Sequence, residues 1–143
     1  MTIARILAAK GGDVVTTQPH RTLAEVAEVL AAKNIGAVVV ADIQGSVIGI
    51  LSERDIIRAV GKRGTSVFND AASMHMTAEV ITTSEDECVH VALEKMTDGR
   101  FRHLPVIRHE RLVGLVSIGD LVKHRLAEYE YEQKVLREYI ATA

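Results

Sequence analysis

The feature of this sequence that most constrains its fold is an internal repeat. Residues 14–41, moved along the chain by 66 positions, align with a second segment of the same pattern, and a one-residue deletion in the turn at 43–46 changes the offset to 65. The identical pairs are Val14 and Val80, Thr16 and Thr82, Thr17 and Thr83, Glu28 and Glu94, Val40 and Val106, Gly49 and Gly114, Ser52 and Ser117, and Asp55 and Asp120. Because the apolar periodicity repeats with these identities, we interpret the two halves as copies of one unit.

Both copies show the same order of helix and strand patterns. Apolar residues at i, i+3, i+4 and i+7 predict a helix with one buried face, at Leu23, Val26, Ala27 and Leu30 and again at Val89, Ala92, Leu93 and Met96. Two short apolar runs then predict paired strands, at 37–41 and 47–51 and at 104–107 and 112–117. Each second run leads into Ser-x-x-Asp and another apolar-striped helix, at 55–60 and 120–126. The predicted unit is strand, helix, strand, strand, helix.

The size of this unit predicts how the copies are organised. A unit of about 50 residues would leave much of its sheet open to water, so the two copies are expected to pack together as one α+β domain. A short helix at 3–9 precedes the first copy, and a similar one follows a surface loop within 61–76. We therefore divide the chain into a first repeat with its lead-in helix at 1–62, a connector and second repeat at 63–126, and a C-terminal helical extension at 127–143.

The C-terminal segment has a different pattern. Its apolar stripe alternates by four and three residues along one continuous helix, at Val122, Leu126, Tyr129, Gln133, Leu136 and Ile140. This spacing suits a seam between two helices and predicts a homodimer. The alternative, that the stripe folds back on its own domain, stays open because the stripe is short and contains the polar Gln133.

Composition and charge exclude several classes of function. The chain has 17 Lys and Arg against 19 Asp and Glu, a net charge of −2, which removes the electrostatic case for binding nucleic acid or anionic membranes. The single cysteine, Cys88, excludes an internal disulfide and a cysteine-built zinc site. The N-terminal apolar run is too short for a signal peptide, and no run approaches the roughly 18 apolar residues of a membrane span. We therefore expect a soluble, cytoplasmic protein.

Nothing in the sequence predicts catalysis. The histidines form no i, i+4 pair with further ligands, so no metal site is expected; they are His20, His75, His90, His103, His109 and His124. Cys88 begins a helix but has no base pattern near it, so we interpret it as a helix-start residue rather than a nucleophile. We predict that the protein is not an enzyme.

The repeated Ser-x-x-Asp, at 52–55 and 117–120, is the best candidate for ligand chemistry. The carboxyl end of a strand and the amino end of a helix offer free N–H groups and a positive dipole end to phosphate, and a carboxylate one turn into the helix can accept the two hydroxyls of a ribose. The alternative is that each tetrapeptide is only a helix cap. Arginine side chains suit a phosphate, and Arg102 with His103 in the second copy and Arg54 in the first supply the nearest basic groups.

These motifs resemble those of a tandem pair of cystathionine-beta-synthase (CBS) domains, the Bateman module. The resemblance rests on Gly49–Asp55 with Ile35–Val40 and on His103–Val106 with Gly114–Asp120, and it covers roughly residues 1–126. It implies two pseudo-twofold related β-α-β-β-α units packed sheet to sheet with two clefts between them. It also implies a regulatory sensor that binds adenosine-containing ligands such as AMP, ADP, ATP, NAD or S-adenosylmethionine, and a disc-like dimer.

The resemblance also implies which residues form each cleft. In the first cleft Asp120 would bind the ribose, and the phosphate and base would contact Ser117, Arg102, His103, Thr17, Thr22, Ile35 and Gly36. In the second cleft Asp55 would take the role of Asp120, together with Ser52, Arg54, Gly36, Ala37, Thr83, Cys88 and Phe101. Pro105, inside the second motif, completes the candidate ligand-binding residues. Because Gly36 and Ala37 bring no charge, this assignment leaves the second cleft poorly suited to a multiply charged nucleotide.

Two functions from different classes remain. The first is a stand-alone regulatory module that binds AMP, another adenine nucleotide or NAD, senses the energy or redox state, and modulates an unidentified partner protein. The second is a ligand-free structural or interaction module that acts through dimerisation and its C-terminal helix. Retention of both aspartates, Asp55 and Asp120, favours the first.

Overall fold

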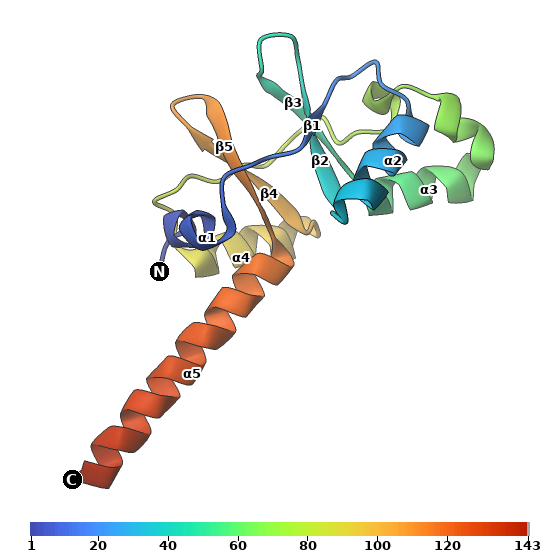
Figure 1. The fold of residues 1–143 in the computed structure, drawn as a ribbon. Coiled ribbons are helices and arrows are strands. Elements are labelled where there is room, and N and C mark those ends of the chain that lie inside the picture. Colours follow the sequence, from blue (N-terminus) through green and yellow to red (C-terminus); the bar gives the residue numbers. More distant parts are fainter. Residues whose placement is uncertain (143) are drawn as a thin grey trace.

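The computed structural model describes residues 1–142 and has the mixed α+β architecture that the repeat predicts (Figure 1). The first half contains α1 (Ile3–Lys10), β1 (Thr16–Thr17), α2 (Leu23–Lys33), β2 (Ala37–Ala41), β3 (Val47–Ser52) and α3 (Glu53–Arg63). Two 3₁₀ helices follow, η1 (Thr65–Asn69) and η2 (Ala72–Met74). The second half contains α4 (Val89–Gly99), β4 (His103–Arg108), β5 (Arg111–Ser117) and α5 (Ile118–Thr142).

Strand pairing in the two sheets confirms the repeat, including the position of a register shift in each hairpin. In the first sheet β2 lies between β1, which is parallel to it, and β3, which is antiparallel to it. The second sheet pairs β4 with β5, and the equivalent of β1 is reduced to a parallel bridge between Thr83 and Val106. Both hairpins shift register at the same place, after Val40 in one and after Val106 in the other. The 66-residue offset thus relates pairing and bulge as well as sequence.

Each repeat has its own hydrophobic core, but a segment from outside the repeat completes it. The first core is built from α2, β2, β3 and α3 and includes Val67 of η1 and Ala72 of η2. The second is built from α4, β4, β5 and α5 and includes Ile3 and Ile6 of α1. Helix α1 therefore precedes the first repeat in sequence but packs with the second. The loop expected at the start of the connector, residues 61–66, lies on the surface, but it is mostly helical because α3 continues to Arg63 and η1 begins at Thr65.

Backbone hydrogen bonds hold these lead-in segments in place. Ala4 N–H donates to Glu85 O at 2.8 Å, and Val89 N–H donates to Met1 O at 3.0 Å. In the other half, Leu23 N–H donates to Asp70 O at 3.0 Å, and Ala72 N–H donates to Arg21 O. The segment before each repeat is thus bonded to the start of the main helix of the other repeat.

Helix α5 is a single 25-residue helix that leaves the body as a projecting arm (Figure 1). Its one buried residue is Leu121, so the predicted apolar stripe is not covered by the chain's own domain. None of the helices in the described part of the chain combines the length and apolar character needed to cross a membrane.

A matched pair of substitutions tests the role of α1 in the second core. Ile3 is fully buried, whereas Ile43 in the β2–β3 turn is fully exposed. We expect Ile3→Ala to lower the free energy of unfolding by about 2–5 kcal/mol because it leaves a cavity, and Ile43→Ala to change it by less than about 0.5 kcal/mol. Urea denaturation of both variants measures this. Equal effects would show that α1 is not part of the core.

Candidate functional site

Both Ser-x-x-Asp tetrapeptides form complete helix caps. Asp55 N–H donates to Ser52 Oγ at 3.3 Å, and Ser52 N–H donates back to Asp55 Oδ2 at 2.9 Å. The equivalent distances for Asp120 and Ser117 are 3.1 and 2.8 Å. Each cap uses the Oδ2 oxygen of its aspartate and fixes the orientation of the carboxylate. The capping and ligand interpretations of the motif are therefore compatible, because the cap leaves each carboxylate a second oxygen.

Two cavities lie between the repeats at equivalent positions. The cavity beside Asp55, here called the Asp55 cavity, has a volume of about 280 Å³, and the cavity beside Lys10, here called the Lys10 cavity, about 320 Å³. Residues 79–81 and 100–103 of the second repeat line the first, and residues 13–15 and 34–37 of the first repeat line the second. These segments differ by the same offset of 66 positions. Each cavity is completed by the end of a strand from the opposite repeat, which carries Ser52 or Ser117.

The two cavities differ strongly in charge. The Asp55 cavity is lined by four arginines, Arg54, Arg58, Arg100 and Arg102, against the acidic residues Glu53, Asp55 and Glu79. The Lys10 cavity has one lysine and one carboxylate, Asp13, in its lining. The difference comes from divergence at equivalent positions, since Arg100 corresponds to Asn34 and Arg102 to Gly36. The backbone is similar around both cavities, but only the Asp55 cavity has arginine side chains in its lining that suit an anion.

Arg100 stands in a backbone conformation that arginine rarely adopts. It is the C-cap of α4, with φ of 56°, and its equivalent Asn34 caps α2 with φ of 54°. Asparagine tolerates this left-handed region, whereas a longer side chain is strained there. Arg100 is also in the lining of the Asp55 cavity.

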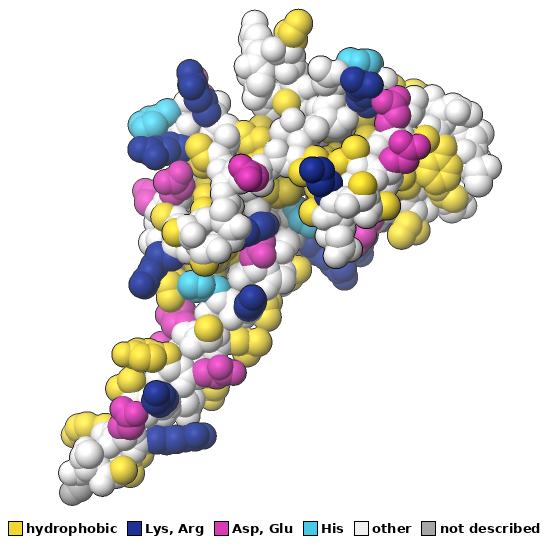
Figure 2. Space-filling model, viewed as in Figure 1, with side chains coloured by type: hydrophobic (Ala, Val, Ile, Leu, Met, Phe, Trp, Pro, Cys, Tyr) yellow, Lys and Arg dark blue, Asp and Glu magenta, His cyan; other side chains and the backbone are white. Residues whose placement is uncertain are grey.

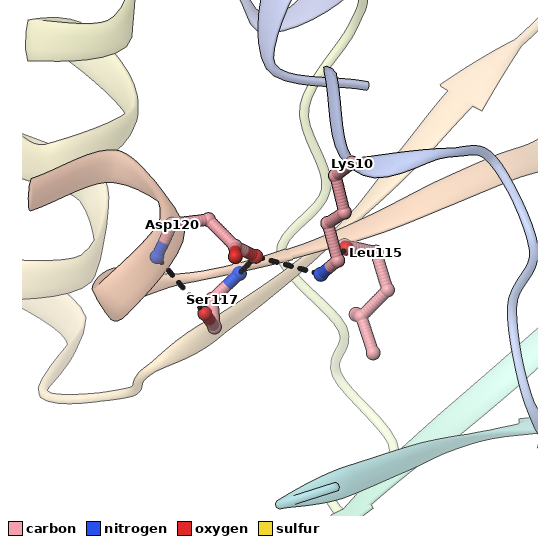
Figure 3. A network of polar contacts seen from close by, with 4 residues as sticks. All are labelled: Lys10, Leu115, Ser117 and Asp120. Carbon is pink, nitrogen blue, oxygen red and sulfur yellow. Dashed lines mark hydrogen bonds and ion pairs between the residues drawn. The ribbon is translucent and has the colours of Figure 1, made fainter. Parts of the chain in front are cut away.

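Lys10 links α1 to the second Ser-x-x-Asp. Its Nζ donates to Asp120 Oδ2 at 2.6 Å and to Leu115 O at 2.7 Å (Figure 3). Burial raises the pKa of Asp120, but the hydrogen bond from Lys10, the Ser117 N–H and the lysine charge together outweigh it and lower the pKa. Asp120 is therefore an ionised, paired carboxylate. Sequence reasoning missed Lys10, because its equivalent in the repeat is Met76 and no local motif contains it.

His103 lines both cavities. Burial lowers its pKa, the nearby Lys10 charge lowers it further, and the carboxylates of Glu53 and Asp120 oppose the shift only in part. A Cβ added at Gly36 would lie 3.3 Å from His103 Nε2, so glycine permits this close approach. At neutral pH His103 is an uncharged hydrogen-bonding group shared by the two cavities.

The structure places the predicted site residues in three groups. Ser52, Arg54, Asp55, Phe101, Arg102 and His103 line the Asp55 cavity. Ile35, Gly36, Ala37, Ser117 and again His103 line the Lys10 cavity. Thr17, Thr22, Thr83, Cys88, Pro105 and Asp120 are not in the lining of either. Of these, Thr22 caps α2, Thr83 is buried beside β4, and Asp120 lies behind Lys10.

The structure distributes the basic residues differently from the expectation. Arg102 was assigned to the cleft of Asp120 but lines the cavity of Asp55, and Gly36 and Ala37 line the other cavity. The reason is that each cavity joins the strand end of one repeat to the turn that precedes a strand of the other. The Asp55 cavity therefore contains Arg58, Arg100 and Arg102 in addition to the expected Arg54. Arg58 and Arg100 were not predicted as site residues. Comparison of every lining segment with its counterpart 65 or 66 residues away was the signal that could have identified them.

Comparison with known proteins identifies the same pair of repeats. The sequence model described as the CBS domain matches residues 9–62 and 71–127. A CBS-domain-containing protein of Agrobacterium tumefaciens is 43% identical, with a TM-score of 0.85 over 87% of this chain and 92% of that one. A CBS domain protein of Pyrobaculum aerophilum complexed with AMP is 31% identical, with a TM-score of 0.75 over 84% and 89%. A CBS domain pair in complex with 5′-methylthioadenosine and S-adenosyl-L-methionine is 26% identical, with a TM-score of 0.80 over 90% and 98%.

Substitution of Lys10 by its counterpart in the repeat tests the pairing with Asp120. We expect Lys10→Met to raise the pKa of Asp120 and to lower the free energy of unfolding at pH 7 by up to about 1 kcal/mol. A carboxylate with a lowered pKa stabilises the fold above its unfolded-state pKa, and this contribution is lost as the pH falls through its folded-state pKa. The difference between variant and wild type should therefore shrink in acid.

Carboxyl-carbon NMR titration and urea denaturation at several pH values measure both quantities. Lys62→Met is the matched control, because Lys62 also lies in the last turn of a helix but outside both cavities. An unchanged Asp120 titration in Lys10→Met would contradict the pairing.

Proposed function

The chain belongs to the CBS domain family, as a tandem pair of repeats, and we propose that it is a regulatory module that binds an adenosine-containing ligand between them. Related CBS structures hold AMP, or 5′-methylthioadenosine and S-adenosyl-L-methionine. The observation that carries the proposal here is the Asp55 cavity, in which one capped carboxylate, one aromatic ring and four arginines surround a single space. We place the ligand in this cavity.

The roles of the residues follow from their chemistry. The free oxygen of the Asp55 carboxylate accepts the ribose hydroxyls, because the cap holds the carboxylate at the cavity wall. Phosphate is bound by Arg100 and Arg102 and by the N-terminus of α3, where Arg54 also lies. The apolar side chains of Phe101 and Val80 cover the base. AMP, ADP and ATP fit this distribution, and NAD is the dinucleotide alternative.

The Lys10 cavity is the poorer site for a nucleotide. Its single lysine already pairs with Asp120, so it offers no free cation to a phosphate, and Asp120 itself is not in its lining. A phosphate in the same cavity would draw Lys10 away from Asp120. We therefore propose that the Asp55 cavity is filled first and that the Lys10 cavity takes a ligand of lower charge.

A ligand held between two repeats has a direct route to regulation. It contacts both repeats, so it favours the relative arrangement of the repeats in which those contacts are best. We propose that this module works as a homodimer in the cytoplasm, where its one cysteine stays reduced, and that it reports the energy or redox state to another protein. It needs no catalytic residues for this role.

Asp55→Asn tests the ribose contact. Asparagine keeps an oxygen for the cap but loses the charge and one of the acceptors, so we expect the affinity for AMP and for adenosine to fall about tenfold or more with little change in stability. Asp120→Asn, the pseudo-symmetric control, should leave this affinity within about twofold. Isothermal titration calorimetry with AMP, NAD and adenosine measures the effect. If no adenosine-containing ligand binds wild type, the ligand-free interaction module becomes the better description.

Arg100→Asn tests the phosphate contact with two readouts that should move in opposite directions. Asparagine relieves the left-handed strain, so we expect the free energy of unfolding to rise by up to about 1 kcal/mol. Loss of the guanidinium should weaken AMP about tenfold and leave adenosine unchanged. Arg108→Gln, at an exposed arginine outside both cavities, is the control. Equal losses for AMP and adenosine would exclude the phosphate role.

A further inference from the structure

The projecting part of α5 presents an apolar stripe that its own chain leaves uncovered. Figure 2 shows hydrophobic side chains along this arm, interleaved with charged ones. Leu126, Tyr129, Leu136 and Ile140 are between 51% and 66% exposed. Exposed apolar side chains aligned along one helix indicate a surface that another molecule covers.

The spacing of the stripe defines a heptad register. Leu126, Gln133 and Ile140 occupy the a positions, and Val122, Tyr129 and Leu136 occupy the d positions. The stripe therefore has the geometry of a two-helix seam. A polar residue at a central a position, here Gln133, favours a single register in such seams.

Charges beside the seam identify the occupant as a second copy of α5. Between Val122 and Ile140 the g positions hold Arg125, Glu132 and Tyr139, and the e positions hold Lys123, Glu130 and Arg137. In a parallel pair, each g residue faces the e residue five positions further along the other helix. Arg125 then faces the partner's Glu130, and Glu132 faces the partner's Arg137, so both contacts join opposite charges.

The antiparallel arrangement lacks this complementarity. When two antiparallel helices overlap fully, g residues face g residues and e residues face e residues. Glu132 then faces the partner's Glu132, and Glu130 faces the partner's Glu130, so like charges meet. We propose that two copies of the chain pair through α5 as a parallel, in-register coiled coil from Val122 to Ile140. This inference rests on the homodimer of the proposed function and specifies its seam.

Parallel pairing places the seam next to a ligand cavity. Asp120, which is bound to Lys10, lies in the first turn of α5, and Val122 begins the seam two residues later. Both globular bodies then lie at the same end of the coiled coil. The seam spans 19 residues, which is short for a coiled coil, so we expect the dimer to depend on protein concentration.

Charge exchange at one pair tests the orientation. Glu132→Arg alone sets arginine against the partner's Arg137, and Arg137→Glu alone sets glutamate against the partner's Glu132. Each single variant should raise the dimer dissociation constant about tenfold. The double variant Glu132→Arg/Arg137→Glu, and an equimolar mixture of the two single variants, should restore dimerisation. Sedimentation velocity over a concentration series measures all four samples.

Loss of helix cannot explain the expected result. Glu132→Arg places arginine four residues after Glu128, and Arg137→Glu places glutamate three residues after Lys134, so both substitutions add a favourable pair within the helix. Circular dichroism checks this. Single variants that dimerise like wild type, or a double variant that stays weak, would overturn the parallel arrangement.

Cross-linking tests the register independently. In a Cys88→Ser background, Gln133→Cys should form an intermolecular disulfide on mild oxidation, because equal a positions face each other only in a parallel, in-register pair. Lys134→Cys in the same background lies outside the seam and should not. Equal cross-linking of both variants, or none, would overturn the register.

Calorimetry with AMP on the same variants separates this inference from the proposed function. If AMP binds but charge exchange does not change dimerisation, the coiled-coil proposal is rejected and the proposed ligand site is retained. If dimerisation depends on these charges but no adenosine-containing ligand binds, the coiled-coil proposal is retained and the proposed ligand site is rejected.

Discussion

Neither repeat encloses its own hydrophobic core, and the rest of the architecture depends on this constraint. Ile3 and Ile6 of α1 complete the second core, and Val67 and Ala72 of the connector complete the first. The chain therefore crosses between the halves once at 13–15 and again at 79–81, the two segments that line the cavities. Each cavity lies beside one of these crossing segments. The two equivalent spaces therefore result from the path of the backbone and do not depend on which side chains line them.

Sequence periodicity predicted what depends on local structure. The 66-residue offset, the helix stripes and the paired strands all appear in the structure, because each reflects which face of an element is buried. The placement of Arg102 and Lys10 could not be predicted in this way. Arg102 reaches the Asp55 cavity and Lys10 reaches Asp120 across contacts between distant segments, and periodicity carries no information on which segments face each other.

Duplication explains how one fold holds two different sites. Both copies keep the cap, the hairpin with its bulge, and the left-handed turn at Asn34 and Arg100, because these features set the backbone. Several residues in the cavity linings are free of that requirement and have diverged, such as Asn34 and its counterpart Arg100. Gly36 stands where the other copy has Arg102, and its missing side chain allows the approach of His103. Under the proposed function, a symmetric frame with unequal charge separates ligands by phosphate content rather than by shape alone.

The Lys10–Asp120 contact connects this frame to α5. Lys10 ends α1, Asp120 lies in the first turn of α5, and the 2.6 Å contact joins them at the edge of the Lys10 cavity. Under the proposed function, an anion in that cavity competes with Asp120 for the lysine. His103 extends the connection to the Asp55 cavity, because it lines both spaces and its pKa responds to Lys10, Glu53 and Asp120. If a ligand binds more tightly when α5 is in one orientation than in another, its binding shifts the equilibrium between the two orientations. The size of the shift is the difference between the two binding free energies. Under the proposed function, α5 is therefore the element through which occupancy of the cavities reaches a second molecule.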